Sequence, residues 1–300
     1  MSTIKLFKTL PGQVTELKPE AFGVEKSLQR MIENNLELFL GVRFLETEYN
    51  TGKRHAGRID TLGIDENGAP VIIEYKRSIN ENVINQGLFY LDWLLDHKGE
   101  FTLMVLKKYG RETSENIEWA NSRLLCIAGD YTKYDEYAVE QINRNIELIR
   151  YRKFDDGIIL FELVNAISAV SPAAEKTDTP VMRVTVEEFL NKMGAAEKDR
   201  YEDLKAFIMT LGDDVQEKIT KHYIAFKRLY NFACFEFHPN DKEILIFLKI
   251  DPTTVALVEG FSRDVRKIGH FGTGDLELRI KSDEDAIKAQ ELIRLSYENS

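Results

Sequence analysis

The 300-residue sequence contains little cysteine and no long hydrophobic run. Its two cysteines, Cys126 and Cys234, are too few for a disulfide framework or a cysteine-rich zinc site. No stretch approaches the ~18 consecutive apolar residues that a transmembrane helix needs. Residues 1–10 are too polar for a signal peptide. These absences predict a cytoplasmic, globular protein that has no membrane partner.

Positive charge is scarce as well. The chain has 40 Lys and Arg against 50 Asp and Glu, which gives a net charge of −10. This balance excludes a general nucleic-acid coat protein, which would be basic, but it is compatible with an enzyme that has a locally basic face. Apolar residues make up 43% of the chain, enough for a substantial core. At roughly 100–200 residues per domain, the length predicts two domains.

One segment has the composition of a linker. Residues 166–180 read AISAVSPAAEKTDTP, in which small residues, Ser, Thr and Pro replace the patterned apolar residues found on either side. We therefore expect a first domain over 1–168, a linker over 169–181 and a second domain over 182–300.

Hydrophobic periodicity predicts the elements of both domains. In the first domain we expect helices over 24–39, 80–97 and 135–143, and strands over 58–65, 69–76, 101–107, 124–128, 146–154 and 157–164. This order predicts an α/β fold with a mixed sheet. In the second we expect helices over 186–193, 200–211, from 253 onward and over 283–297, and strands over 223–227, 232–237, 243–250 and 275–280. Ser282 is a candidate N-cap of the last helix. The second domain is thus a small α+β domain.

The most informative segment is the first hairpin. Gly57-Arg58-Ile59-Asp60 opens one strand, and Glu74-Tyr75-Lys76 ends the other. Glu74 and Lys76 share a face, because strand side chains alternate. A two-residue Asn-Gly loop pairs Asp60 with Tyr75 and leaves Glu74 on the opposite face. A three-residue loop with Gly68 as a bulge pairs Asp60 with Glu74 instead. The Asn67-Gly68 sequence suits the bulge.

In the second register Asp60, Glu74 and Lys76 converge. Two carboxylates provide hard oxygen ligands, which suit Mg²⁺ or Mn²⁺. Such a metal polarises a phosphate and lowers the pKa of a bound water. Lys76 is then placed to position the water or to stabilise negative charge on the phosphate. The chemistry that this set supports is phosphodiester hydrolysis, with Asp60 and Glu74 as the metal ligands.

The ordered set of residues resembles the PD-(D/E)XK nuclease superfamily, in the branch of the mismatch-type endonucleases called NucS-like. The resemblance covers about residues 20–110 and involves a helix with Glu25, the strand with Asp60, the strand with Glu74 and Lys76, and a helix with Gln86 and Tyr90. It implies a restriction-endonuclease-like core and a Mg²⁺- or Mn²⁺-dependent endonuclease, a hydrolase that acts on ester bonds of DNA. It also adds Glu25 and Gln86 to the candidate catalytic residues.

Other residues of the first domain are candidates for contacting DNA. Lys53, Arg54 and Arg58 form a basic cluster just before Asp60 and can contact phosphates. Tyr90 is a further candidate. An ordinary charged loop explains the basic cluster equally well, and Gln86 and Tyr90 are also compatible with a packing role on their helix.

The second domain resembles a bacterial and archaeal domain of unknown function that is often labelled a predicted transport protein. Matching stretches are KHYIAFKR at 221–228, NFAC at 231–234 and GHFGTGDL at 269–276. Lys221, Tyr223 and Lys227 alternate along a predicted strand, and His270 lies in a glycine-rich loop. Basic and aromatic residues interleaved on a sheet can bind a nucleic-acid strand, although a solvated sheet face with Tyr223 packed fits the same pattern.

The sequence therefore predicts a metal-dependent DNA endonuclease joined to a domain that binds nucleic acid or a partner. The alternative is an inactive nuclease-fold protein that serves as a binding module for nucleic acid or protein. The sequence leaves open whether the DNA is duplex, branched or single-stranded. The oligomeric state also stays open, a homodimer included.

Overall fold

The first domain is built on a mixed seven-stranded sheet, as the sequence predicts. The computed structural model describes residues 4–20, 25–52, 57–76, 83–167 and 186–300. The strand order is β3-β8-β7-β6-β5-β4, and β9 pairs with the remaining side of β8. Strands β4, β5 and β6 are antiparallel, whereas β6, β7 and β8 are parallel. The strands are β3 (Pro19–Glu20), β4 (Val42–Asn50), β5 (Arg58–Asp65), β6 (Pro70–Lys76), β7 (Arg123–Ala128), β8 (Asn145–Phe154) and β9 (Ile159–Ile167).

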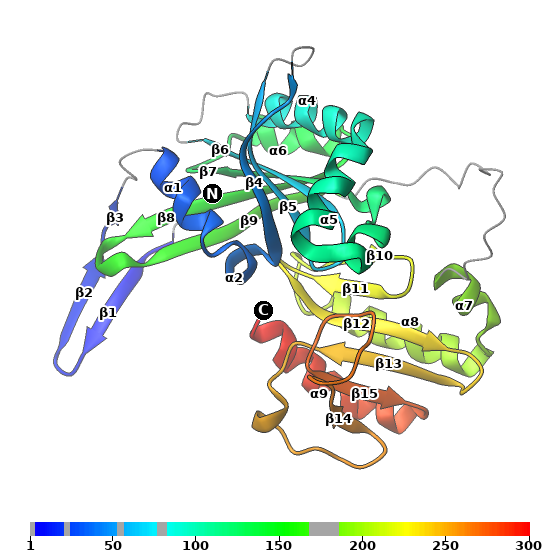
Figure 1. Ribbon diagram of the computed structural model, residues 1–300. Coiled ribbons are helices and arrows are strands. Elements are labelled where there is room, and N and C mark those ends of the chain that lie inside the picture. The colour runs from blue at the N-terminus through cyan, green and yellow to red at the C-terminus, as the bar shows by residue number, and fades with distance from the viewer. Residues whose placement is uncertain (1–3, 21–24, 53–56, 77–82, 168–185) are drawn as a thin grey trace.

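Helices cover both faces of this sheet (Figure 1). On one face, α1 (Glu25–Glu33) and α2 (Leu36–Leu40) pack on Val71, Ile73 and Tyr75. On the other, α4 (Val83–Asp96), α5 (Lys98–Glu115) and α6 (Lys133–Glu140) pack on the face of Ile72. Because both faces of the sheet are covered, β6 consists of apolar and aromatic residues apart from Glu74 and Lys76.

Several predicted elements of the first domain differ in the structure. Residues 101–107 are helical and belong to α5, so the predicted strand is wrong: Phe101 and Val105, four residues apart, are the buried positions. A short apolar run is compatible with a strand or a helix. In this run the buried residues recur at helical spacing. The helix predicted over 24–39 is divided into α1 and α2. Strand β4 was not predicted, nor was the hairpin of β1 (Leu6–Leu10) and β2 (Gln13–Leu17), which projects from the domain in Figure 1.

The second domain has a six-stranded antiparallel sheet in the order β10-β11-β12-β13-β15-β14. Its strands are β10 (Gln216–Ile219), β11 (Ile224–Lys227), β12 (Asn231–His238), β13 (Glu243–Leu248), β14 (Ser262–Asp264) and β15 (Leu276–Ile280). Helices α7 (Val186–Lys192), α8 (Ala195–Met209) and α9 (Asp283–Glu298) cover one face of it. The small α+β domain is thus confirmed.

Local signals in the second domain were mostly correct. Ser282 caps α9 and forms a capping box with Asp285. The helix predicted from 253 onward is only a single 3-10 turn, Pro252–Thr254. The predicted linker over 169–181 lies outside the described residues. In the part of the chain that the structure describes, no helix combines the length and the apolar character that crossing a membrane requires.

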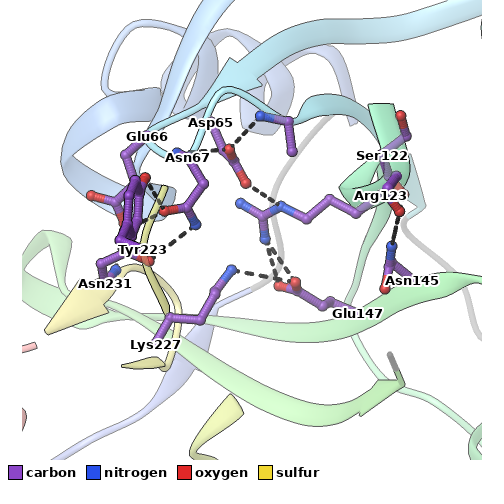
Figure 2. A network of polar contacts seen from close by, with 12 residues as sticks. Asp65, Glu66, Asn67, Ser122, Arg123, Asn145, Glu147, Tyr223, Lys227 and Asn231 are labelled. Atoms are coloured by element: carbon purple, nitrogen blue, oxygen red, sulfur yellow. Dashed lines mark hydrogen bonds and ion pairs between the residues drawn. The ribbon is translucent and has the colours of Figure 1, made fainter. Parts of the chain in front are cut away.

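The two domains meet through buried charges (Figure 2). The Arg123 guanidinium donates to both Glu147 carboxylate oxygens, at 2.7 and 2.9 Å, and to Asp65 Oδ2 at 3.0 Å. From the second domain, Lys227 Nζ lies 3.4 Å from Glu147 Oε1. Burial alone would raise the pKa of Glu147, but Arg123 and Lys227 outweigh it and lower that pKa to about 2. Glu147 is therefore ionised and holds cations from both domains.

Beside this charge cluster, the β5–β6 turn inserts into the second domain. The Asn67 and Asn231 side-chain amides donate to each other's oxygens at 3.1 and 2.6 Å, and Tyr223 OH donates to Asn67 Oδ1 at 2.9 Å. Tyr223 and Lys227 are 5% and 2% exposed. Their predicted role as contacts to nucleic acid is therefore wrong: both side chains are buried against the first domain.

Loss of the Glu147 charge should destabilise the whole protein. In Glu147→Gln, Arg123 and Lys227 keep buried charges with fewer partners, and we expect a loss of about 3–5 kcal/mol in the free energy of unfolding. Urea denaturation measures this change. The control is Glu284→Gln, which removes an exposed carboxylate paired with Lys288 and should leave the midpoint unchanged. Equal midpoints for the wild type and Glu147→Gln would contradict the assignment of this interface.

Candidate functional site

The β5–β6 hairpin has the three-residue turn that brings the two carboxylates together. Gly68 adopts φ +78, the left-handed conformation that favours glycine. Asp65 Oδ1 accepts the N–H groups of Asn67 and Ala69 at 2.9 and 2.8 Å. Strand pairs run from Ile64–Pro70 to Thr61–Ile73. The next pair in this register is Asp60 with Glu74, so the three-residue alternative is confirmed.

At this position the carboxylates themselves bridge the two strands. Glu74 Oε1 accepts the Asp60 N–H at 3.2 Å, and Asp60 Oδ2 accepts the Tyr75 N–H at 3.1 Å. Each side chain thus binds a backbone donor on the opposite strand, and the acidic groups are held close together. Glu74 is completely buried, and its second oxygen, Oε2, has no hydrogen-bond partner.

Burial and mutual repulsion make this pair reluctant to ionise. Burial is the main cause that raises the pKa of Glu74, to about 9, and the neighbouring Asp60 charge adds to it. Burial also raises the pKa of Asp60, against the lowering effects of the Tyr75 N–H and of Lys76. A buried carboxylate with an unpartnered oxygen is costly, and perturbed groups of this kind concentrate at functional sites.

Lys76 and α1 complete the edge of the site. Lys76 follows Glu74 on the same face, and its Nζ lies 3.9 Å from Glu25 Oε1, at the start of α1. In the next turn of α1, the Gln29 amide donates to the Asp60 carbonyl at 2.8 Å. The structure therefore brings together Glu25, Asp60, Glu74 and Lys76, as the sequence predicts.

Helix α4 supports the site from behind. Tyr90 OH accepts the Arg58 N–H at 3.1 Å, and Gln86 lies 3.4 Å from the same hydroxyl. A Cβ at Gly57 would meet the Tyr90 ring at 2.5 Å, so glycine is required there. Tyr90 is only 6% exposed, and its predicted role as a contact to nucleic acid is wrong. Gln86 remains a candidate, although its side-chain amide donates to the Tyr90 hydroxyl.

The remaining predicted residues lie in several places. Lys53 and Arg54 lie outside the described residues. Arg58 is exposed at the edge of the site. In the second domain, Lys221 precedes β11 and is half-buried, and its N–H donates to Glu118. His270 is also half-buried and stacks on Phe247, with ring centroids 4.3 Å apart. The roles of Arg58, Lys221 and His270 as contacts to DNA stay predictions.

The sequence reasoning missed two residues of this region. Gln29 supports the Asp60 backbone, and Glu48 lies opposite Asp60 on β4, a strand that was not predicted. The run VRFLETEYN over residues 42–50, with its β-branched and aromatic residues, is the signal that could have indicated this strand. Glu25 and Glu48 both contribute repulsion that raises the pKa of Asp60.

Comparison with known proteins gives the family of the chain. An uncharacterized protein from Haemophilus influenzae (strain ATCC 51907 / DSM 11121 / KW20 / Rd) is 30% identical over 292 residues, which cover 93% of this chain and 94% of that protein. The chain belongs to the same family as this protein. Within the chain, residues 186–300 match the model of a domain of unknown function, DUF5655. The match covers all of the described residues of the second domain.

Solved structures match part of the chain. A repair endonuclease from Pyrococcus abyssi is 21% identical, with a TM-score of 0.30, and the match covers 44% of this chain and 48% of that one. A structure of EndoMS in complex with double-stranded DNA is 20% identical, with a TM-score of 0.26, and the match covers 44% and 46%. The chain spans about half the length of these structures.

The Glu74 carboxyl should make stability depend on pH. Because its pKa is near 9 in the folded protein and near 4.5 when unfolded, the folded state keeps the proton over this range and the unfolded state loses it. The free energy of unfolding therefore falls as pH rises through this window. Glu74→Gln removes the effect, so in EDTA the variant should exceed the wild type by at least about 1.4 kcal/mol at pH 8, equivalent to one pKa unit.

Urea denaturation at pH 4 and pH 8 measures this difference. At pH 4 the two proteins should be equally stable, since Glu74 is protonated in both the folded and the unfolded state. Glu46→Gln, on an exposed position of β4, is the control and should match the wild type at both pH values. A Glu74→Gln variant that is less stable than the wild type at pH 8 would show that the carboxylate is paired in a way that the geometry lacks.

Proposed function

We propose that the first domain is a metal-dependent endonuclease that hydrolyses phosphodiester bonds of DNA, with Asp60 and Glu74 as the ligands of Mg²⁺ or Mn²⁺. The observation that carries this proposal is the Glu74 carboxylate, which is buried beside Asp60 with Oε2 lacking a hydrogen-bond partner. A divalent cation between the two side chains would balance their repulsion and give this oxygen a partner.

The donor set fits Mg²⁺ or Mn²⁺. Among the described residues, no group of three or more His, Cys, Asp or Glu side chains is arranged to hold a metal ion. The pair therefore supplies two hard oxygen ligands. Two carboxylates agree with the usual coordination of Mg²⁺, which keeps several waters and binds one or two carboxylates together with phosphate oxygens of the substrate. When bound, the metal supplies Lewis-acid activation of the phosphate and a more acidic water.

The residues around the pair have separate roles in this proposal. Lys76 is partly buried and directed toward the same face, so its ammonium can stabilise negative charge that develops on the phosphate. Glu25 lies within ion-pair distance of Lys76 and orients it. Gln86 supports Tyr90, which in turn holds the Arg58 backbone, and we assign Gln86 a positioning role.

The choice of DNA as the substrate depends on the resemblance of the ordered residues to the PD-(D/E)XK nucleases. Glu25, Asp60, Glu74 and Lys76 meet in one place although they come from three separate elements. This convergence supports the resemblance. Arg58, exposed next to Asp60, provides positive charge at the edge of the site in an otherwise acidic protein.

Replacing either metal ligand should remove both metal binding and cleavage. In Asp60→Ala or Glu74→Ala we expect no Mn²⁺ binding by calorimetry, because the remaining carboxylate gives only one ligand. We expect cleavage of supercoiled, branched, mismatched and single-stranded DNA with Mg²⁺ or Mn²⁺ to fall at least about 100-fold, the scale of losing one main electrostatic contribution to catalysis.

The same assay separates the proposal from the rival function, a nuclease-fold protein without turnover that binds nucleic acid or protein. Binding of DNA without cleavage by the wild type, with either metal, would favour the binding module. Glu46→Gln is the control and should keep full cleavage and metal binding. Equal Mn²⁺ affinities in the wild type and both alanine variants would end the assignment of the metal site.

A further inference from the structure

Glu48 extends the row of acidic residues across a third strand. Thr47 pairs with Thr61 and Tyr49 pairs with Ile59, so Glu48 is opposite Asp60, just as Asp60 is opposite Glu74. Its backbone has φ +52, the left-handed region that a glutamate in a strand rarely adopts. Glu48 thus lies in the same part of the sheet as the proposed metal ligands, but its carboxylate contacts two cations.

The Glu48 carboxylate is held between two cations at the edge of the site. Arg58 Nε forms an ion pair with Oε2, and Lys26 Nζ lies 3.9 Å from Oε1. Both cations extend toward solvent: their side chains are 64% and 58% exposed, against 23% for Glu48. They come from β5 and α1, the elements that also carry Asp60 and Glu25. The pair of cations therefore flanks the site, with one carboxylate between them.

The Glu48 carboxylate binds a guanidinium and an ammonium, the two groups that also bind the phosphates of DNA. The Arg fork binds carboxylate and phosphate oxygens with similar geometry, and the Lys ammonium binds either as a point charge. Lys26 and Arg58 are the exposed members of these ion pairs, and an ion pair whose cation stays largely solvated contributes little to stability. A phosphate of the DNA backbone, held by further contacts along the strand, can therefore replace the carboxylate at low cost.

We propose that Lys26 and Arg58 form a phosphate-binding site for the DNA backbone beside the Asp60–Glu74 pair, and that Glu48 occupies this site until a phosphate displaces it. This inference rests on the proposed function, since it takes DNA as the ligand. Glu48 is then a residue that determines specificity: it weakens binding of every anion at this position. Only a ligand with additional contacts, such as a nucleic-acid strand, compensates for its displacement.

The test is DNA binding without cleavage. Fluorescence anisotropy with a labelled duplex in EDTA, at several salt concentrations, gives the affinity and its salt dependence. Glu48→Gln should bind roughly two- to fivefold more tightly than the wild type, since the competing ion pairs are lost. Its slope of log affinity against log salt should be steeper by up to about 0.9, because in the wild type the displaced Glu48 carboxylate takes up a cation and offsets part of the counterion release. Lys26→Gln and Arg58→Gln should weaken binding and flatten the slope.

Two controls separate a local effect from a general one. Glu46→Gln removes the same charge from an exposed position two residues away on β4 and should leave affinity and slope as in the wild type. Without the two cations, Glu48→Gln should give no gain in affinity, because no cations remain to be released. The triple variant Lys26→Gln, Arg58→Gln, Glu48→Gln should therefore bind DNA as tightly as the double variant Lys26→Gln, Arg58→Gln. Thermal melting shows that each variant is folded, and Glu48→Ala replaces Glu48→Gln if the latter is not.

Equal affinity and slope in Glu48→Gln and the wild type would overturn the inference. So would the same gain in Glu46→Gln, or a gain that persists in the triple variant. A wild type that binds no DNA, with no binding in Glu48→Gln either, would also overturn it. If the wild type shows no cleavage with Mg²⁺ or Mn²⁺ but Glu48→Gln has the expected gain, the nuclease proposal fails and the phosphate site stands.

Discussion

The register of the β5–β6 hairpin is the constraint on which both the site and the domain interface depend. Its three-residue turn places Gly68 in the left-handed conformation and lets Asp65 bind the turn N–H groups. A shift by one residue would move every side chain of one strand to the opposite face. The Asp60–Glu74 pair would then be lost, and so would the insertion of Asn67 between Tyr223 and Asn231. One turn thus sets the chemistry at one end of the hairpin and the domain contact at the other.

Burying the Asp60 and Glu74 carboxyl groups is energetically costly, yet hydrogen bonds to the backbone hold both of them in place. The ladder of β5 and β6 gives way to side-chain contacts at the site, because the two carboxylates accept N–H groups of Asp60 and Tyr75. Those bonds hold the acidic groups against their repulsion, while the burial of Glu74 keeps its pKa near 9. A protein that only needed a stable sheet would have an apolar residue there. Functional sites typically carry such destabilising groups, and the rest of the fold compensates for them.

The second domain attaches through buried polar contacts and through Leu229, which packs on the core cluster of the first domain. Its core cluster lies between the sheet and α7, α8 and α9, whereas the opposite face directs Lys227 at Glu147 and Tyr223 at Asn67. Buried ion pairs contribute less to stability than their geometry suggests, because their charges lose hydration. Their geometric demands are strict, however: Arg123 binds Glu147 and Asp65 within the first domain and so fixes the carboxylate that receives Lys227 of the second domain. The interface is therefore selective for one arrangement of the domains.

Features that depend on neighbouring residues were predictable from the sequence. The period of two in β5 and β6, the Asn67-Gly68 turn and the Ser282 cap depend on a few neighbouring residues, so the hairpin, the face of Glu74 and Lys76, and the start of α9 could be predicted. The mixed sheet followed from the order of helices and strands. The short apolar run at residues 101–107 fits a helix or a strand equally, so propensity could not identify it as part of α5.

Tertiary structure decided which charged and aromatic residues face solvent. The partners of Lys227 and Tyr223, Glu147 and Asn67, are 80 and 156 residues away, so the sequence carries no local signal that these side chains are buried in the domain interface. The same holds for Tyr90 beneath the Arg58 backbone and for Glu48 opposite Asp60, since both contacts require strands and helices to come together in space. Burial and cross-strand neighbours are long-range properties. They decided which of the predicted residues form the site and which hold the domains together.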